Sequence, residues 1–198
     1  MGRGTQTFAL RTLIFATLLG FCLWVLLVST SQGQATATNL SCVAVDPLKG
    51  ARGKVVVLLF VRTDCPISNR YSTTIQHLSI QHVGKAAFWL VYPDRAESAE
   101  MIHKHVQDFG YQLPALRDPQ HALVRQSHVR ITPEAAVFDA DHRLVYHGRI
   151  DNLYQDFGRT RTVATTHELD DAIRAAIDGK TLQSDSVPAV GCYISDLE

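Results

Sequence analysis

The sequence lacks an excess of charge of either sign, because 19 Lys and Arg residues balance 19 Asp and Glu residues. A chain without net charge creates no field that would attract a polyanion, so we exclude nucleic acid as a partner. The sequence also contains no internal repeat and no low-complexity segment, while hydrophobic residues make up 46% of it. This composition is ordinary for a globular protein and excludes a long disordered tail.

Cysteine is scarce, with four residues in a chain of 198. Cys22 lies in an apolar N-terminal stretch, which leaves Cys42, Cys65 and Cys192 in the remainder. In an oxidising compartment, three cysteines imply one pair and one free thiol, or a set whose pairing changes during function.

The N-terminus has the pattern of an export signal. Arg3 and Arg11 precede an uncharged apolar stretch at residues 12–28, and a polar run follows it. The stretch has no polar face, which argues against a core helix. Its length lies between that of a signal peptide core and that of a membrane span, so a cleaved peptide and an uncleaved anchor both remain open.

We therefore predict a signal peptide or membrane anchor at residues 1–37 and one domain at residues 38–198. Small residues at 35–37 slightly favour cleavage. Because the positive residues precede the apolar stretch, the domain is expected outside the cytoplasm, periplasmic or secreted, with the N-terminal segment in at least transient contact with the membrane.

The domain has the alternating pattern of an α/β protein. Apolar runs at residues 55–61 and 86–92 predict buried central strands. A helical apolar stripe lies between them and ends near Gly84, so the three elements predict a parallel βαβ unit. The stripe consists of Ile67, Tyr71, Ile75 and Leu78.

Further elements follow from capping patterns and short apolar runs. Asp94 with Glu97, and Thr165 with Glu168, have the form of capping boxes before helices that end at Gly110 and Gly179. The remaining expectations are a short helix at 121–128 capped by Asp118 and Pro119, an antiparallel hairpin of strands at 135–138 and 144–147, and a surface loop at 151–162.

Cys65 is the main candidate for chemistry. It lies where the first buried strand meets a helix that starts at Pro66, so it occupies the helix cap. Amide groups at a helix start stabilise a thiolate and lower a thiol pKa from about 8.5. We therefore expect an accessible, ionised sulfur at this position, although Asp64 would oppose the effect. The alternative is a free cysteine buried for packing.

Several ordered motifs resemble known redox proteins. Residues 60–71 are similar to the active-site region of thioredoxin-like redoxins, and residues 129–139 are similar to their cis-proline loop and following strand. Residues 146–151 and 190–194 resemble a peroxiredoxin-like subgroup of the alkyl hydroperoxide reductase and thiol-specific antioxidant superfamily. The resemblance implies a thioredoxin fold, a central mixed sheet flanked by helices. The site residues it implies are Cys65 as the attacking thiol, Ser68, Thr132, a cis Pro133 opposite Cys65, and Cys192.

The departures from these families limit the chemistry. Ser68 stands where thioredoxins have their second cysteine, which excludes a disulfide within that motif. Arg62 stands where peroxiredoxins have a threonine, and no activating arginine is identified, although Arg130 lies near Pro133. A resolving thiol can come from elsewhere, and Cys192 is the first candidate. A structural Cys42–Cys192 disulfide is the alternative.

The sequence thus predicts an extracytoplasmic thiol-disulfide oxidoreductase or peroxiredoxin-like antioxidant protein that uses a single nucleophilic cysteine, Cys65, in a motif that ends in Ser68. Its partners would be a protein disulfide or peroxide and a thiol reductant, and it needs no cofactor because sulfur carries the electrons. The alternatives are a copper-delivery module and a redox-silent structural domain. A copper site would draw on His103 and His105 together with Cys65 and Cys192. Residues two apart on a helix diverge, however, which favours a solvated face for the two histidines and no metal.

Overall fold

The computed structural model describes residues 37–198, apart from residues 52, 183–185, 196 and 198. The predicted signal or anchor segment lies outside the described residues except for Ala37, so its boundary with the domain stays a prediction. In the part of the chain that the structure describes, no helix has both the length and the apolar character needed to cross a membrane.

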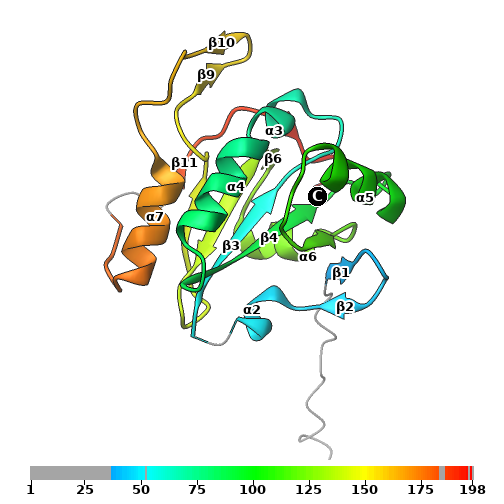
Figure 1. Ribbon diagram of the computed structural model, residues 1–198, viewed down its shortest axis with the longest axis horizontal. Helices are drawn as coiled ribbons and strands as arrows, with labels where there is room; N and C mark the ends of the chain where they lie inside the picture. Colours follow the sequence, from blue (N-terminus) through cyan, green and yellow to red (C-terminus); the bar gives the residue numbers. More distant parts are fainter. Residues whose placement is uncertain (1–36, 52, 183–185, 196, 198) are drawn as a thin grey trace, which may run out of the picture. The chain divides into compact units, whose positions relative to one another are not determined.

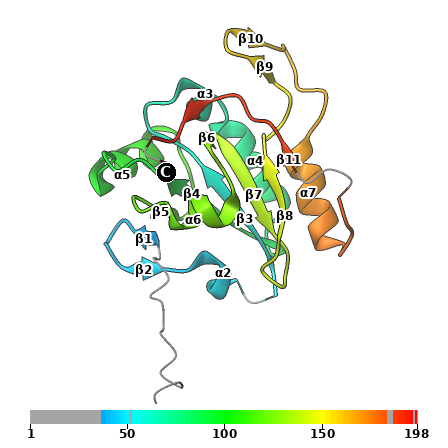
Figure 2. The same ribbon diagram turned by 180° about the vertical axis from the view of Figure 1, so that it is seen from behind.

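The described elements alternate along the chain (Figures 1 and 2). The strands are β1 (Ala37–Asn39), β2 (Ala44–Val45), β3 (Val55–Phe60), β4 (Ala86–Tyr92), β5 (Ala115–Arg117), β6 (Ile131–Thr132), β7 (Glu134–Phe138), β8 (Leu144–Gly148), β9 (Tyr154–Asp156), β10 (Arg159–Thr160), β11 (Ser186–Val187) and β12 (Cys192–Tyr193). The helices are α2 (Pro47–Gly50), α3 (Pro66–Arg70), α4 (Ser72–Gln81), α5 (Ala99–Asp108), α6 (Ala122–Ser127) and α7 (Glu168–Ile177).

A mixed sheet forms the centre, with strand order β11-β8-β7-β3-β4-β5-β1-β2. β3, β4 and β5 run parallel, and Val55 pairs with Ala86 at the start of the β3–β4 register. β7 is antiparallel to both β3 and β8. The predicted parallel βαβ unit and the predicted antiparallel hairpin are therefore both confirmed.

The strands at the centre of the sheet are buried because both faces of the sheet are covered. All six side chains of β3 are buried, and they alternate between two apolar clusters. One cluster packs the sheet against α3, α4, α5 and α7, and the other packs it against α2 and α6. This two-sided burial explains why β3 reads in the sequence as an unbroken apolar run.

The predicted helix after β3 is two helices. α3 ends and α4 begins at Tyr71, whose backbone amide donates hydrogen bonds to the carbonyl oxygens of Ile67 and Ser68. The Tyr71 hydroxyl donates a 2.6 Å hydrogen bond to Asp151 Oδ1. Because Tyr71 is buried and tied to Asp151, one apolar stripe continues across both helices, and the stripe alone does not reveal the break.

Two predicted capping boxes are wrong. Ser98, not Asp94, caps α5, and its hydroxyl accepts the amide of Met101. His167 is the cap residue of α7, and its side chain makes no capping bond. The carboxylates of Glu97 and Glu168 had suggested the capping boxes. Both form hydrogen bonds to other groups and not to the predicted cap residues.

The short helix α6 has a cap that differs from the expected one. Its cap residue is His121, in the left-handed region with φ of 56°. Asp118 still caps the helix from further back, since its carboxylate accepts the amides of Ala122 and Val124. Pro119 is accordingly not the first helical residue.

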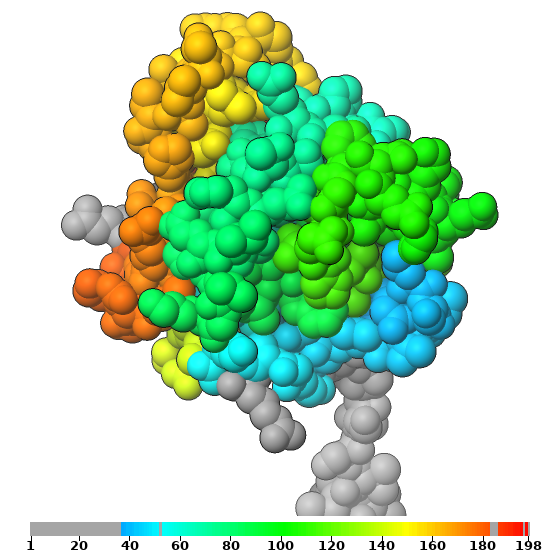
Figure 3. All heavy atoms as spheres, viewed as in Figure 1, coloured from blue at the N-terminus to red at the C-terminus, as the bar shows by residue number. Residues whose placement is uncertain are grey.

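The predicted surface loop at 151–162 contains structure. Asp151 and Asn152 are buried, and the paired strands β9 and β10 follow them. Figure 3 shows these strands standing out from the surface beside α3 and α4. These strands have no clear sequence pattern, because they are short and mostly exposed.

Candidate active site

Cys65 occupies the N-cap of α3, directly before Pro66, as the sequence predicted. The loop before it is held by one side chain from α3 and one from the loop that precedes α5. The Thr63 amide donates a 2.6 Å hydrogen bond to Glu97 Oε1, and the Thr63 carbonyl oxygen accepts one of 3.1 Å from Asn69 Nδ2. Asn69 is positioned in turn by His105, whose Nε2 lies 2.8 Å from Asn69 Oδ1. The loop therefore has a defined conformation.

The loop before Pro133 lies against the Cys65 sulfur. The Thr132–Pro133 peptide bond is cis, as the resemblance implied. As a neutral thiol, Cys65 donates a 3.3 Å hydrogen bond to the Thr132 carbonyl oxygen. The Glu134 carboxylate accepts hydrogen bonds of 2.9 and 3.2 Å from the amides of Arg130 and Ile131. Glu134 thus fixes the backbone that faces Cys65.

The C-terminal segment covers this loop. β12 pairs antiparallel with β6, with Cys192 opposite Thr132. Figure 2 shows this segment in red beside β6 and α3. The Thr132 hydroxyl donates to the Cys192 carbonyl oxygen at 3.3 Å, and the Ile194 amide donates to the Arg130 carbonyl oxygen at 3.0 Å. The segment therefore extends the cis-proline loop by one strand.

Gly191 allows this close approach. A Cβ at this position would lie 2.2 Å from the Thr132 carbonyl oxygen and 2.7 Å from Ile131 Cγ2. Atoms that are not bonded to each other do not approach this closely. Only glycine lets the segment reach the loop with Cys192 in its observed register.

The Cys65 and Cys192 sulfurs are in contact. Cys192 Sγ lies 2.9 Å from Cys65 Sγ, close enough for a thiol hydrogen bond and longer than a disulfide bond of about 2.05 Å. Both thiols are free, as is Cys42, which is exposed in the turn between β1 and β2. The structure thus brings Cys192 to Cys65, and the alternative Cys42–Cys192 disulfide is not formed.

One expectation for Cys65 is wrong. Its side chain is fully buried, with 0% of its surface exposed, whereas the sequence suggested an accessible sulfur. The thiol is nevertheless beside Pro133, and part of its cover is the short segment that carries Cys192. Cys192 itself is partly exposed.

The two thiols have opposite pKa shifts. Burial raises the pKa of Cys65, but hydrogen bonds from Cys192, from the Ser68 amide and hydroxyl and from the Ile67 amide outweigh burial, so the pKa of Cys65 is lowered overall. Burial, the hydrogen bond to Cys65 and the charge of Cys65 raise the pKa of Cys192 to about 11. Cys65 is therefore the more acidic thiol of the pair, and Ser68 lies where it stabilises a negative charge on the Cys65 sulfur.

The nearest charged side chains largely neutralise one another. Arg62 forms ion pairs with Asp64 at 3.0 Å and with Asp94 at 3.1 Å. Arg62 lowers the pKa of Cys192, whereas Asp64 raises it. Arg130, the cation noted in the sequence, is exposed. The ionisation of Cys65 therefore depends on hydrogen bonds at the helix start more than on a nearby cation.

Glu97 is an acid buried beside this loop. Its side chain is 4% exposed, and Oε2 has no hydrogen-bond partner. Burial is the main cause that raises the pKa of Glu97, and the Thr63 hydrogen bonds and Arg62 only partly oppose it. Ionisation of such a buried carboxylic acid is unfavourable, because its second oxygen has lost its hydration.

The proposed copper ligands do not come together. Both ring nitrogens of His105 are occupied, since Nδ1 lies 2.8 Å from the Tyr92 hydroxyl and Nε2 contacts Asn69. His105 is buried, so the expected solvated face applies to His103 but not to His105. Across the described residues, no group of three or more His, Cys, Asp or Glu side chains has a geometry that could hold a metal ion.

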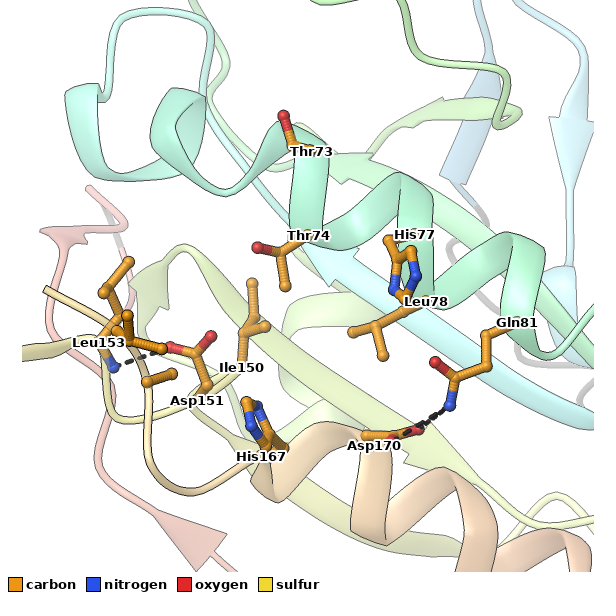
Figure 4. A pocket seen from close by; sticks show the side chains of 12 residues that line it. Thr73, Thr74, His77, Leu78, Gln81, Ile150, Asp151, Leu153, His167 and Asp170 are labelled. Atoms are coloured by element: carbon orange, nitrogen blue, oxygen red, sulfur yellow. Dashed lines mark hydrogen bonds between the residues drawn. The ribbon is translucent and has the colours of Figure 1, made fainter.

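A cavity of about 550 Å³ lies between α4, α7 and the chain after β8 (Figure 4). Gln81 donates to Asp170 at one end, and Asp151 accepts the amide of Leu153 at the other. Neither Cys65 nor Cys192 lines it. The cavity is therefore separate from the sulfur pair.

Sequence reasoning missed three residues that shape the site, namely Glu97, Glu134 and Gly191. Glu134 follows directly after Pro133, and Gly191 directly precedes Cys192, so proximity to the candidate residues was the available signal. Glu97 gave a misleading signal, because the Asp94–Glu97 spacing suggested a helix cap. Its contact with Thr63 spans 34 positions and has no local signature.

Comparisons with known proteins agree with this geometry. Residues 53–144 match a family model described as thioredoxin-like. A search of curated proteins by sequence gave no match.

Solved structures show the same fold at low sequence identity. A hypothetical protein from Sinorhizobium meliloti is 21% identical over 80% of this chain and 88% of its own, with a TM-score of 0.68. An uncharacterized conserved protein from Geobacillus kaustophilus is 22% identical over 80% and 86%, with a TM-score of 0.69. A secreted disulfide oxidoreductase of Mycobacterium tuberculosis is 16% identical over 75% and 99%, with a TM-score of 0.50.

The mixed sheet flanked by helices agrees with the family match and with the solved structures. The chain therefore has the thioredoxin fold, and residues 53–144 are similar to thioredoxin-like domains.

Proposed function

We propose that this chain is an extracytoplasmic thiol-disulfide oxidoreductase in which Cys65 and Cys192 alternate between dithiol and disulfide. The observation that carries the proposal is the 2.9 Å contact between the two sulfurs at the start of α3. The fold supports it, since a secreted disulfide oxidoreductase is among the solved structures that share it.

The reduced pair is suited to reduce an external disulfide. The segment that carries Cys192 must first move away from Cys65, which is fully buried in the observed arrangement. The Cys65 thiolate then attacks one sulfur of the substrate disulfide, forms a mixed disulfide and releases the other substrate sulfur as a thiolate that takes a proton. Cys192 then loses its proton and attacks the Cys65 sulfur, which releases the second substrate thiolate. The substrate gains two electrons, and the protein ends with a Cys65–Cys192 disulfide. An external thiol must then reduce this disulfide.

The surrounding residues have separate roles in this scheme. The amides of Ile67 and Ser68 and the Ser68 hydroxyl stabilise the Cys65 thiolate. The Thr132 carbonyl oxygen and Pro133 form the opposite wall, and Thr132 also positions the backbone of Cys192. A resolving thiol from a distant segment replaces the second cysteine that the Cys65–Ser68 motif lacks.

The proposal differs from a mechanism with one cysteine, which would leave Cys192 idle. Peroxide reduction by Cys65 is a further outcome of the test, but no contact at the site specifically favours it. Export is supported by the N-terminal pattern of Arg3, Arg11 and the apolar stretch. The secreted solved structure agrees with it.

The test measures reduction of a protein disulfide, such as that of insulin, by the purified full chain with dithiothreitol as the electron source. Cys65→Ser is expected to abolish turnover. In a single turnover without dithiothreitol, Cys192→Ser is expected to stop at a mixed disulfide on Cys65. Cys42→Ser is the matched control, with normal turnover in the full assay. Full activity of Cys65→Ser would refute the proposal. Consumption of hydrogen peroxide without disulfide reduction would replace it with a peroxidase.

A further inference from the structure

We propose that the oxidised protein reacts with external thiols at Cys192, so that Cys65 is the sulfur that leaves. This inference rests on the proposed Cys65–Cys192 disulfide and specifies which of its two sulfurs an electron donor attacks.

The two sulfurs differ in access. Cys65 is completely buried beneath β12 and against the Thr132 carbonyl oxygen. Cys192 is partly exposed, and the neighbouring Tyr193 is 73% exposed. A disulfide opens only when a thiolate reaches one sulfur in line with the bond, so access selects the sulfur that is attacked. In the observed arrangement, Cys65 has no exposed surface, and Cys192 is the partly exposed member of the pair.

The segment that covers Cys65 is held closed on both sides of Cys192. The Ile194 amide bonds to Arg130, and the Ile194 side chain is only 5% exposed. On the other side, Gly191 packs directly on Thr132. A Cys65–Cys192 bond would add a covalent restraint to this pairing. The oxidised state is therefore expected to keep Cys65 covered.

The leaving group also favours this direction. A thiol with a lower pKa leaves faster from a disulfide. The amides of Ile67 and Ser68 and the Ser68 hydroxyl lower the pKa of Cys65 whatever Cys192 is bonded to, while burial, the first cause that raises the pKa of Cys192, acts on Cys192 in either case. Cleavage at Cys192 releases the stabilised Cys65 thiolate, whereas cleavage at Cys65 would release the more basic thiolate.

The reaction balances with two molecules of a monothiol. The first thiolate forms a bond to Cys192 Sγ, the Cys65–Cys192 bond breaks, and its electron pair stays on Cys65. The second thiolate attacks the sulfur of the bound monothiol and releases Cys192, which takes a proton. The monothiol is oxidised to its disulfide, and the protein disulfide is reduced.

The test uses the full chain, oxidised, with reduced glutathione as the probe. Samples taken at short times are quenched with N-ethylmaleimide, digested with trypsin and analysed by mass spectrometry. Trypsin cuts after Arg62, Arg70 and Lys180, which places Cys65 and Cys192 in separate peptides. Extrapolation to zero time removes the effect of later exchange between the two sulfurs.

We expect the first product to carry glutathione on Cys192 and N-ethylmaleimide on Cys65. Glutathione on Cys65 at zero time would overturn this inference and leave the proposed function standing. A starting protein without a Cys65–Cys192 disulfide would overturn both.

A variant tests whether access decides the outcome. Gly191→Ala forces the covering segment away from Thr132, so the share of glutathione on Cys65 is expected to rise. Gly50→Ala is the matched control, because a Cβ there meets no atom within 4 Å, and its product should be that of the unmodified chain. An unchanged product for Gly191→Ala would count against control by access.

Discussion

Gly191→Ala should weaken the disulfide between Cys65 and Cys192. The new Cβ would lie 2.2 Å from the Thr132 carbonyl oxygen, so the segment has to move by roughly 1 Å to restore normal contact. This movement disturbs the β6–β12 pairing, because Thr132 belongs to β6 and Gly191 directly precedes β12. The two sulfurs can then no longer keep their observed contact at low energy.

The size of the effect follows from the contacts that hold the segment. Each of the hydrogen bonds from Thr132 to Cys192 and from Ile194 to Arg130 is worth about 1 kcal/mol. Burial of the Ile194 side chain adds about 2 kcal/mol. The reduced segment can relieve the clash by moving away, whereas the bond holds the oxidised segment in place. We take the extra strain of the oxidised state as half of this total, about 2 kcal/mol, which is about 30-fold in an equilibrium constant.

The assay is the redox equilibrium of the full chain in glutathione buffers, read by quantifying the Cys65–Cys192 disulfide. The equilibrium constant for Gly191→Ala is expected to fall about 30-fold, and that for Gly50→Ala should stay within about twofold. Circular dichroism checks that both variants are folded. A normal constant for Gly191→Ala would refute the idea that glycine is needed to seat Cys192.

Three further changes test the electrostatics and the support of the site. Cys192→Ala removes a hydrogen bond to the Cys65 thiolate, so the pKa of Cys65 should rise in a titration of thiolate absorbance; an unchanged or lower pKa would contradict the assignment. Burial raises the folded-state pKa of Glu97 above 4.5, so the folded state binds the proton more tightly and ionisation destabilises it. From about pH 4.5 up through the raised pKa, the unmodified chain should lose stability relative to Glu97→Gln in urea unfolding, and a difference independent of pH would exclude this role. Glu134→Ala removes an acceptor of two backbone hydrogen bonds and should lower the free energy of unfolding by about 2 to 4 kcal/mol, whereas the exposed Glu100→Ala should change it by less than about 1 kcal/mol; equal losses would show that Glu134 does not support the loop.

The sequence predicted the centre of the fold well because the signals there are local and strong. The runs that became β3 and β4 are apolar throughout, since both faces of the sheet are covered. Cys65 before Pro66 was placed correctly because a strand, a cap residue and proline follow one another directly. The break at Tyr71 was missed because the apolar stripe continues across it.

The site was only partly predictable because its main contacts join distant parts of the chain. Cys65 and Cys192 are 127 positions apart, and the sequence alone left a Cys42–Cys192 disulfide as the alternative. The burial of Cys65 also depends on β12, a strand of two residues with no periodic pattern. Glu97 was assigned to a helix cap because local spacing cannot show that it reaches back to Thr63.

The wide separation of the two sulfurs along the chain links folding to redox state. A bond between Cys65 and Cys192 would enclose a loop of 127 positions, which contains most of the sheet. Restricting the unfolded chain in this way favours the folded state by about 5 kcal/mol. By thermodynamic linkage, the folded domain protects its disulfide from reduction by the same amount that the disulfide protects the fold. A substitution that destabilises only the oxidised fold would therefore also make the protein a stronger oxidant.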